Sequence, residues 1–153
     1  ACDDGDITLE SFNFDTVTIQ NCTDNNLVFK INDKELLLLS IPESSFLNEE
    51  TPDGSPRIIN VGTTNQIIYR LYSGNVSSAT ICSTLPPASP VVEKEWNASG
   101  GTIEIITDAL YDVDGITING YTHNIKFKNV NFSNPDNSFS FTEYIFGNYE
   151  TDL

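Results

Sequence analysis

Turn-forming residues interrupt the apolar stretches of this chain at intervals of about eight to twelve residues. The strongest are residues 51–54 (Thr-Pro-Asp-Gly), where proline presets φ and glycine accepts positive φ, and the hairpin dipeptide Asn119-Gly120. Between the turns, apolar and polar residues alternate, as at Leu27, Phe29 and Ile31, which is the period of a half-buried strand. The pattern predicts an all-β fold of antiparallel strands with little or no helix.

Three of the expected strands change the parity of their apolar positions. In the clearest case, Ile125 and Phe127 would lie on one face and Val130 and Phe132 on the other. A bulge restores the buried face, or else the strand passes from one sheet to another. We predict bulges or sharp bends at three places: Glu10-Ser11, Lys128-Asn129 and Thr142-Glu143. Either reading predicts a bent antiparallel β-sandwich of about nine or ten strands.

Two segments, residues 35–41 and 85–90, depart from the alternating pattern. Residues Glu35 to Ile41 contain the longest aliphatic run, and they form either a strand buried on both faces or a single helical turn. Pro42 ends the segment in either case, because proline disfavours helix in the residue before it. The proline-rich passage at residues 85–90 is predicted to be extended and to carry the chain from one sheet to another.

Size and charge limit the classes of function. The chain has 153 residues, which suits one domain with a sizeable core. Its 22 acidic and 7 basic residues give a net charge of -15, which argues against nucleic acid as a partner because affinity for phosphate depends on Lys and Arg. No apolar run approaches the roughly 18 residues that a membrane-spanning helix needs.

The three cysteines are Cys2, Cys22 and Cys82, and no pair has metal-ligand spacing. An odd count in an exported protein is explained if Cys2 carries a lipid and the other two form a disulfide. Such a bridge would close a loop of about 60 residues and stabilise the fold by about 4 kcal/mol. The alternative is two buried free thiols.

The first six residues, Ala-Cys-Asp-Asp-Gly-Asp, look like the start of a mature bacterial lipoprotein. We expect residues 1–6 to be a lipid-anchor tether attached through Cys2 and residues 7–153 to form a single β-sandwich domain. The acids at 3, 4 and 6 resemble the signal that exports lipoproteins of the Bacteroidota to the outer face of the outer membrane. Methionine is absent, so we also expect a precursor whose signal peptide has been removed. The alternative is an ordinary disordered acidic end.

Catalysis has little support in the sequence. His123 is the only histidine and lies in a predicted strand, where a structural role is more common than a catalytic one. No G-x-S-x-G elbow accompanies it. We therefore expect no enzyme activity and keep a hydrolase that uses His123, a serine and a carboxylate as an alternative.

We expect no cofactor and no specific metal site. Asp112, Asp114 and Gly115 echo part of a calcium loop, but an EF-hand would then place Leu110 at its first ligand position, so the match fails. Structural calcium elsewhere on the acidic surface stays an alternative. Aromatic residues could form a platform for a carbohydrate or peptide, with Trp96 and Tyr121 as the main candidates and core filling as the alternative. The other candidates are Tyr111, Tyr144 and Tyr149.

A series of short motifs, in order along the chain, resembles a family of uncharacterised flavobacterial (Bacteroidota) outer-membrane lipoproteins. The motifs are Cys2-Asp3-Asp4-Gly5-Asp6, Gln20-Asn21-Cys22, Tyr69-Arg70-Leu71-Tyr72-Ser73-Gly74, Ile81-Cys82, Pro86-Pro87-Ala88, Trp96-Asn97-Ala98, Gly101-Thr102-Ile103-Glu104-Ile105, Ile125-Lys126-Phe127-Lys128-Asn129 and Phe146-Gly147-Asn148-Tyr149. The resemblance implies a secreted, lipid-anchored protein of the outer membrane, and it transfers no catalytic residue.

These observations lead to one principal hypothesis for the function. We expect a non-catalytic binding or accessory module, exported and held on the cell-surface face of the outer membrane through the lipid on Cys2. Its partner would be a glycan, a peptide or an outer-membrane protein. The first alternative is a structural subunit of an outer-membrane complex, and the second is the hydrolase that uses His123.

Overall fold

The computed structural model describes residues 12–23, 27–83, 85 and 87–152 of the chain. Nine antiparallel strands form one continuous sheet, in the order β1-β2-β3-β5-β6-β8-β7-β4, with β9 paired to β8. The strands are β1 (Gln20–Asn21), β2 (Leu27–Asn32), β3 (Glu35–Ser40), β4 (Arg57–Asn60), β5 (Gln66–Tyr72), β6 (Val92–Ser99), β7 (Thr102–Tyr111), β8 (Ile118–Ser133) and β9 (Ser138–Asp152). The sequence-based prediction of an all-β, antiparallel fold is confirmed.

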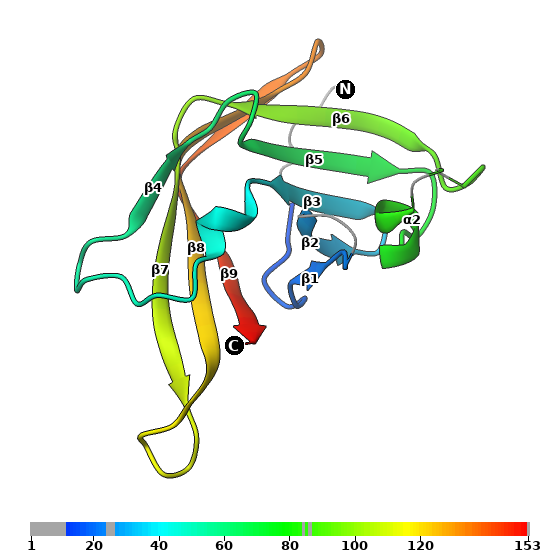
Figure 1. Cartoon of the computed structure of the whole chain (residues 1–153). Helices are drawn as coiled ribbons and strands as arrows, with labels where there is room; N and C mark the ends of the chain where they lie inside the picture. The colour runs from blue at the N-terminus through cyan, green and yellow to red at the C-terminus, as the bar shows by residue number, and fades with distance from the viewer. Residues whose placement is uncertain (1–11, 24–26, 84, 86, 153) are drawn as a thin grey trace.

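The sheet bends so that its two arms enclose a common core (Figure 1). We call β1, β2, β3, β5 and β6 the first arm, and β4, β7, β8 and β9 the second arm. Strand β8 joins them, because it pairs with β7 up to Lys128 and with β6 from Asn131 onwards. Leu39 and Trp96 of the first arm meet Phe127 of the second in the main core. The layered arrangement expected of a sandwich thus arises within a single sheet that is not closed.

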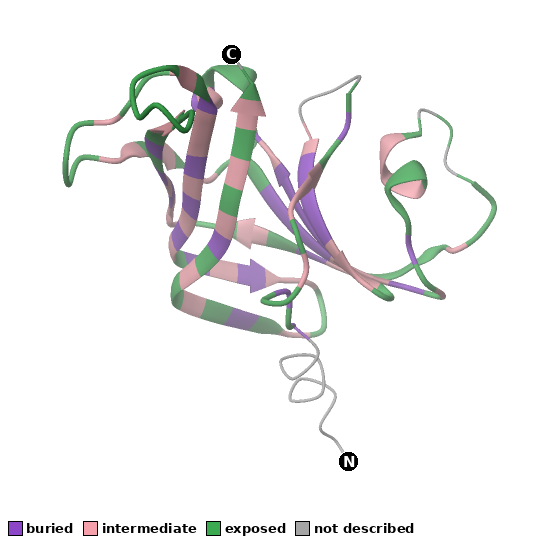
Figure 2. Cartoon of the chain, turned by 90° about the horizontal axis from the view of Figure 1, so that it is seen from below, coloured by how far each residue is buried: buried purple, intermediate pink, exposed green. Residues whose placement is uncertain are grey.

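The predicted bend at Lys128-Asn129 is where β8 changes partner. Asn129 has a φ of 55°, a left-handed conformation that turns the strand and lets Phe127 and Val130 both face the core. Gly101 of the β6–β7 turn packs against this bend, and a Cβ there would collide with the backbone of Lys128 and Asn129. The stripes of buried residues along β8 change phase accordingly (Figure 2).

The other two predicted bulges or bends have different outcomes. Glu10-Ser11 lies outside the described residues. At Thr142-Glu143 the register between β8 and β9 is constant, so no bulge lies there and the two strands bend together. Of the two predicted alternatives, the bend is correct, because the buried side passes from Phe139 and Phe141 to Tyr144 and Phe146. The register instead shifts between Ile125 and Lys126, opposite Gly147, whose φ of 135° only glycine adopts readily.

Strand β3 is buried on both faces, which confirms the strand interpretation of this leucine-rich segment. Leu37 and Leu39 face the main core. Leu36 and Leu38 face a second apolar cluster on the other side of the first arm, together with Tyr72. The predicted Cys22–Cys82 disulfide is present beside this second cluster and joins residues 60 positions apart, with a Cα–Cα distance of 5.4 Å.

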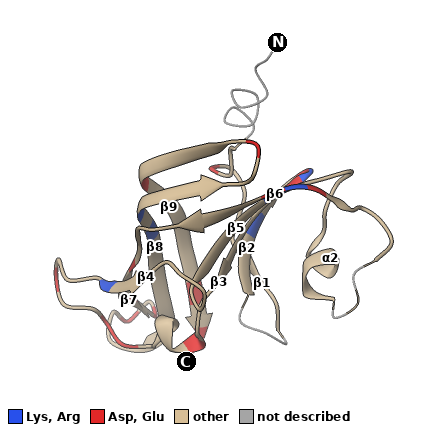
Figure 3. Ribbon diagram, turned by 90° about the horizontal axis from the view of Figure 1, so that it is seen from above, with Lys and Arg blue, Asp and Glu red and all other residues tan. Residues whose placement is uncertain are grey.

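In the part of the chain that the structure describes, helical structure is limited to two short elements, η1 (Glu43–Phe46) and α2 (Ser78–Cys82). Within the described residues, no helix is long and apolar enough to cross a membrane. Acidic residues lie both on loops and on strands, among them β6, β7 and β9, whereas the few basic residues lie mainly on strands (Figure 3).

Candidate ligand-binding site

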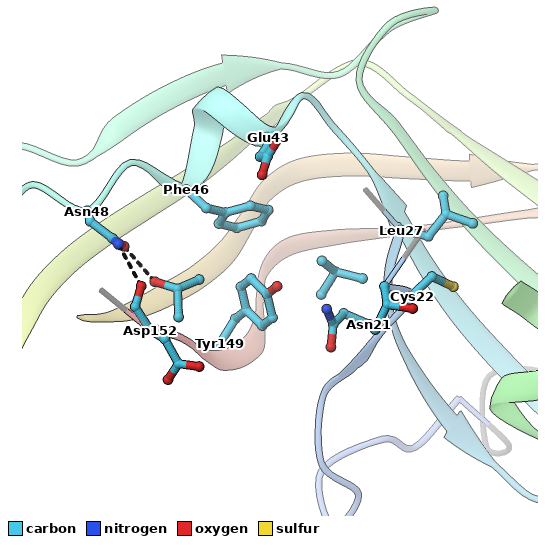
Figure 4. A pocket seen from close by; sticks show the side chains of 11 residues that line it. Asn21, Cys22, Leu27, Glu43, Phe46, Asn48, Tyr149 and Asp152 are labelled. Carbon is cyan, nitrogen blue, oxygen red and sulfur yellow. Dashed lines mark hydrogen bonds between the residues drawn. The ribbon is translucent and has the colours of Figure 1, made fainter. Parts of the chain in front are cut away.

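A pocket of about 300 Å³ opens where the free end of β9 approaches β1 and η1 (Figure 4). Its lining comes from segments that are far apart in the sequence but adjacent in the bent sheet. These residues are Asn21, Cys22, Thr23, Leu27, Val28, Glu43, Phe46, Asn48, Tyr149, Thr151 and Asp152. The pocket therefore exists only because the two arms fold toward each other.

The wall formed by η1 follows from local sequence. Pro42, with a φ of -60°, ends the extended chain after β3, and Ser45 then donates its backbone N–H to the Pro42 carbonyl at 2.9 Å. This turn directs the Phe46 ring inward, edge-to-face with Tyr149 at 5.0 Å and with His123 at 5.5 Å between ring centroids. Two aromatic rings consequently fix one side of the pocket.

His123 lies beneath the pocket and is fully buried. Its Nε2 is 2.9 Å from the Thr151 hydroxyl, and Nδ1 is 2.7 Å from the Thr107 hydroxyl. The Thr151 hydroxyl donates its hydrogen to the Asn48 side-chain carbonyl at 2.6 Å, so it must accept from His123 Nε2–H. Nε2 of His123 therefore carries a hydrogen, and in the neutral imidazole Nδ1 accepts from the Thr107 hydroxyl.

This chain of hydrogen bonds is directed from end to end. Arg57 donates to the Thr107 hydroxyl at 2.6 Å on one side of His123. On the other side, Asn48 donates its amide N–H to the Asp152 carbonyl at 2.8 Å (Figure 4). Each donor has one acceptor along the path, so the side chains that form the pocket floor are held in fixed orientations.

The protonation state of His123 agrees with this geometry. Burial, and then the positive charge of Arg57, lowers the pKa of His123 to about 4. The imidazole is thus neutral at neutral pH. A serine and a carboxylate, which a hydrolytic triad requires, do not contact its ring nitrogens; two threonine hydroxyls do.

The charge of the pocket restricts its ligands. Glu43 and Asp152 are the charged residues of the lining, which contains neither Lys nor Arg. Burial, and then the charge of Glu43, raises the pKa of Tyr149, whose phenol stays neutral and able to donate a hydrogen bond. The arrangement suits an uncharged polar or cationic group and disfavours an anion.

The described residues form no group of three or more His, Cys, Asp or Glu that could hold a metal ion. The Asp112–Gly115 turn has another role. Asp114 accepts hydrogen bonds from the backbone N–H groups of Ile116 and Thr117 and from the Thr117 hydroxyl, and these bonds lower its pKa to about 2. Its carboxylate is used to order the hairpin.

The structure places the predicted site residues apart from one another. Cys2 lies outside the described residues, whereas Cys22 belongs to the pocket lining and forms the disulfide with Cys82. Trp96 is only 1% exposed, packs tilted against Tyr69 and donates its indole N–H to Asn137 at 2.8 Å. The proposed platform of Trp96 and Tyr121 is therefore wrong, because Trp96 fills the core.

Tyr149 is the one aromatic residue from the sequence-based set that reaches the pocket, and sequence reasoning missed Glu43 and Asn48. No local signal marks these two residues, since they follow a strand end in a segment without clear periodicity. Their role depends on the approach of β9, about 100 residues later in the chain.

Comparison with protein-family models, with curated proteins and with solved structures finds no significant match.

Proposed function

We propose that this protein is a non-catalytic binding module, exported and held on the outer face of the outer membrane through a lipid on Cys2. The observation that supports a binding role is the pocket of about 300 Å³ at the open end of the sheet. That volume lies at the lower end of the usual range for ligand pockets, and the buried hydrogen-bond chain beneath it pre-orients the polar groups.

The lipid anchor is tested directly on the native protein. Mass spectrometry of the N-terminal peptide should show a diacylglyceryl group on Cys2, and protease added to intact cells should digest the protein. The Cys2→Ala variant is the control and should leave the membrane fraction. An unmodified Cys2 thiol in the native protein would show that the anchor is wrong, without bearing on the pocket.

The pocket is tested by cross-linking in the native membrane. A photo-reactive residue placed at Glu43, on the exposed rim of the pocket, should yield a specific adduct. The same residue at Asp136, exposed in the turn between β8 and β9, is the matched control and should yield none. Equal labelling from the two positions would argue against a dedicated binding pocket.

One observation favours a second candidate, a structural subunit of an outer-membrane complex. The hairpin between β7 and β8 exposes three large apolar side chains, Tyr111, Val113 and Ile116. Asp114 orders this turn, so the side chains are presented on a defined structure. If this candidate is correct, the double variant Val113→Asp and Ile116→Asp will elute as a free monomer from detergent extracts that hold the wild type in a large complex.

A further inference from the structure

Two strand edges face each other across the opening of the sheet. Among the described residues, β9 pairs only with β8, and β1 pairs only with β2. A groove of about 330 Å³ separates the two edges. It is lined by Thr18, Ile19, Asn21, Asn148, Tyr149 and Glu150.

The backbone direction along β9 follows from two contacts. A Cβ at Gly120 of β8 would collide with the Thr151 carbonyl, so the backbone groups of Thr151 face β8. The Asp152 carbonyl instead accepts from Asn48, on the side away from β8. Because backbone groups alternate along a strand, those of Asn148 and Glu150 also point away from β8 and into the groove.

The same reasoning applies to the opposite edge. The Cys22 N–H donates to the Leu27 carbonyl at 3.1 Å, which directs the backbone groups of Cys22 toward β2. Those of Asn21 and Ile19 therefore point the other way, toward β9. Each edge presents a row of outward N–H and C=O groups, which is the template that an added strand recognises.

Two contacts join the strands beside the groove. The side chain of Lys30 crosses from β2 and donates to the Phe146 carbonyl at 2.6 Å, and Ile19 packs against Gly147 beside it. From there the groove extends toward the end of β9. It joins the candidate pocket, since both share Asn21 and Tyr149.

Charge indicates what kind of chain would enter. Glu150 lines the groove, and Glu43 and Asp152 line the adjoining pocket, whereas neither lining contains Lys or Arg. The nearest cation, Lys30, already donates to the Phe146 carbonyl. We propose that an extended, positively charged segment of a partner protein binds between β1 and β9 as an additional β-strand. This inference rests on the proposed binding function and names the class of partner.

The test uses a synthetic six-residue peptide of alternating lysine and valine with blocked ends, labelled for fluorescence anisotropy. Its control is the same peptide with N-methyl groups on the valines, which keeps the charge but removes strand hydrogen bonds. We expect saturable binding of the first peptide and at least tenfold weaker binding of the second. Equal binding of the two would indicate general attraction to an acidic protein and would overturn the proposal.

Variants of Glu150 locate the site. Glu150→Pro removes an outward N–H that the β8–β9 ladder does not use, so the fold should tolerate it while peptide affinity falls about fivefold. Glu150→Gln removes only the charge and should weaken binding about threefold at low salt. Asp136→Asn, at the far end of β9, is the control for net charge and should leave the affinity unchanged. If Asp136→Asn and Glu150→Gln have the same effect, the groove is not the site.

Hydrogen exchange of the intact protein is a measurement that needs no variant. Without peptide, the amides of Asn148 and Glu150 should exchange rapidly, and with peptide they should be protected at least tenfold. Slow exchange in the free protein would show that the edge is already paired and would overturn the proposal. A specific cross-link from Glu43 combined with failure of the peptide experiments would preserve the binding function and reject only the added strand.

Discussion

The two arms of the sheet differ in what covers their outer faces. In the first arm, Leu36 and Leu38 of β3 pack outward against Tyr72 and a second apolar cluster, beside the disulfide that joins Cys22 to α2. In the second arm, the outer positions of β7 alternate as Glu104, Ile106 and Asp108 and lie partly or fully in solvent. Strands β2, β3 and β5 of the first arm are therefore buried on both faces, and β7 of the second arm on one.

Because of this difference, we expect the two arms to contribute unequally to stability and to recognition. A strand buried on both faces contributes apolar burial twice, whereas a half-buried strand leaves one face and its edge accessible. The free edge of the second arm, at the end of β9, forms one side of the candidate pocket and the groove, and the edge of β1 forms the other. We expect substitutions in the doubly buried strands of the first arm to act on folding and those at the two facing edges to act on binding.

The largest expected effect comes from removing the disulfide. The double variant Cys22→Ser and Cys82→Ser should lower the free energy of unfolding by about 4 kcal/mol, because the bridge closes a loop of about 60 residues. Urea denaturation of the variant and of the oxidised wild type measures the change. A loss below about 1 kcal/mol would mean that the apolar cluster alone holds the outer layer of the first arm.

A pair of matched truncations compares the outer faces themselves. Leu36→Ala, at a fully buried position of β3, should cost about 3 kcal/mol through lost burial and the remaining cavity. Ile106→Ala, on the outer face of β7 where the side chain is 37% exposed, should cost about 1 kcal/mol or less. Thermal unfolding measures the loss of unfolding free energy in each variant. Equal losses in the two variants would contradict the one-sided burial of the second arm.

The fold was predictable because its signals are local. Turn residues, the alternation of Leu27, Phe29 and Ile31 and the parity change in β8 each depend on a few neighbouring positions. The Cys22–Cys82 pairing followed from the cysteine count. The bulge at Gly147 was missed although a glycine inside a strand often marks one, because the parity change of the neighbouring apolar residues pointed to Thr142-Glu143 instead.

The site was much less predictable, because it depends on contacts between distant segments. For Trp96 the sequence allowed either an exposed platform or core filling, and only the position of the ring in β6, which runs to Ser99, decides for the core. His123 was expected to be structural, and its buried contacts with Thr107 and Thr151 agree. Nothing in the local sequence pairs Asn48 with Thr151, since only the bend of the sheet brings η1 to β9.

Acid should weaken the second arm through His123. The pKa of this residue falls from an ordinary 6.5 to about 4 on folding, so the unfolded chain binds the proton more tightly than the folded one. The contribution of neutral His123 to the free energy of unfolding is therefore complete above about pH 6.5 and is lost as the pH falls toward about 4, by about 3 kcal/mol in total. Denaturation curves of wild type and His123→Gln across this range should converge at low pH. A constant difference would show that His123 does not titrate differently on folding.

The smallest effects are expected from ion pairs on the two outer faces. Arg70 contacts Glu95 at 2.6 Å on the first arm and also reaches the Tyr72 hydroxyl at 3.3 Å, so its guanidinium is held from two sides.

On the second arm, Glu143 lies 3.2 Å from Lys128 and 4.0 Å from Lys126 with more exposed side chains. Glu95→Gln should cost about 1 kcal/mol and Glu143→Gln about 0.3 kcal/mol, since exposed pairs are screened and lose side-chain entropy. Raising the salt concentration to about 1 M should abolish the effect of Glu143→Gln and reduce that of Glu95→Gln only partly. The reverse order would mean that charge pairing, and not apolar cover, distinguishes the two arms.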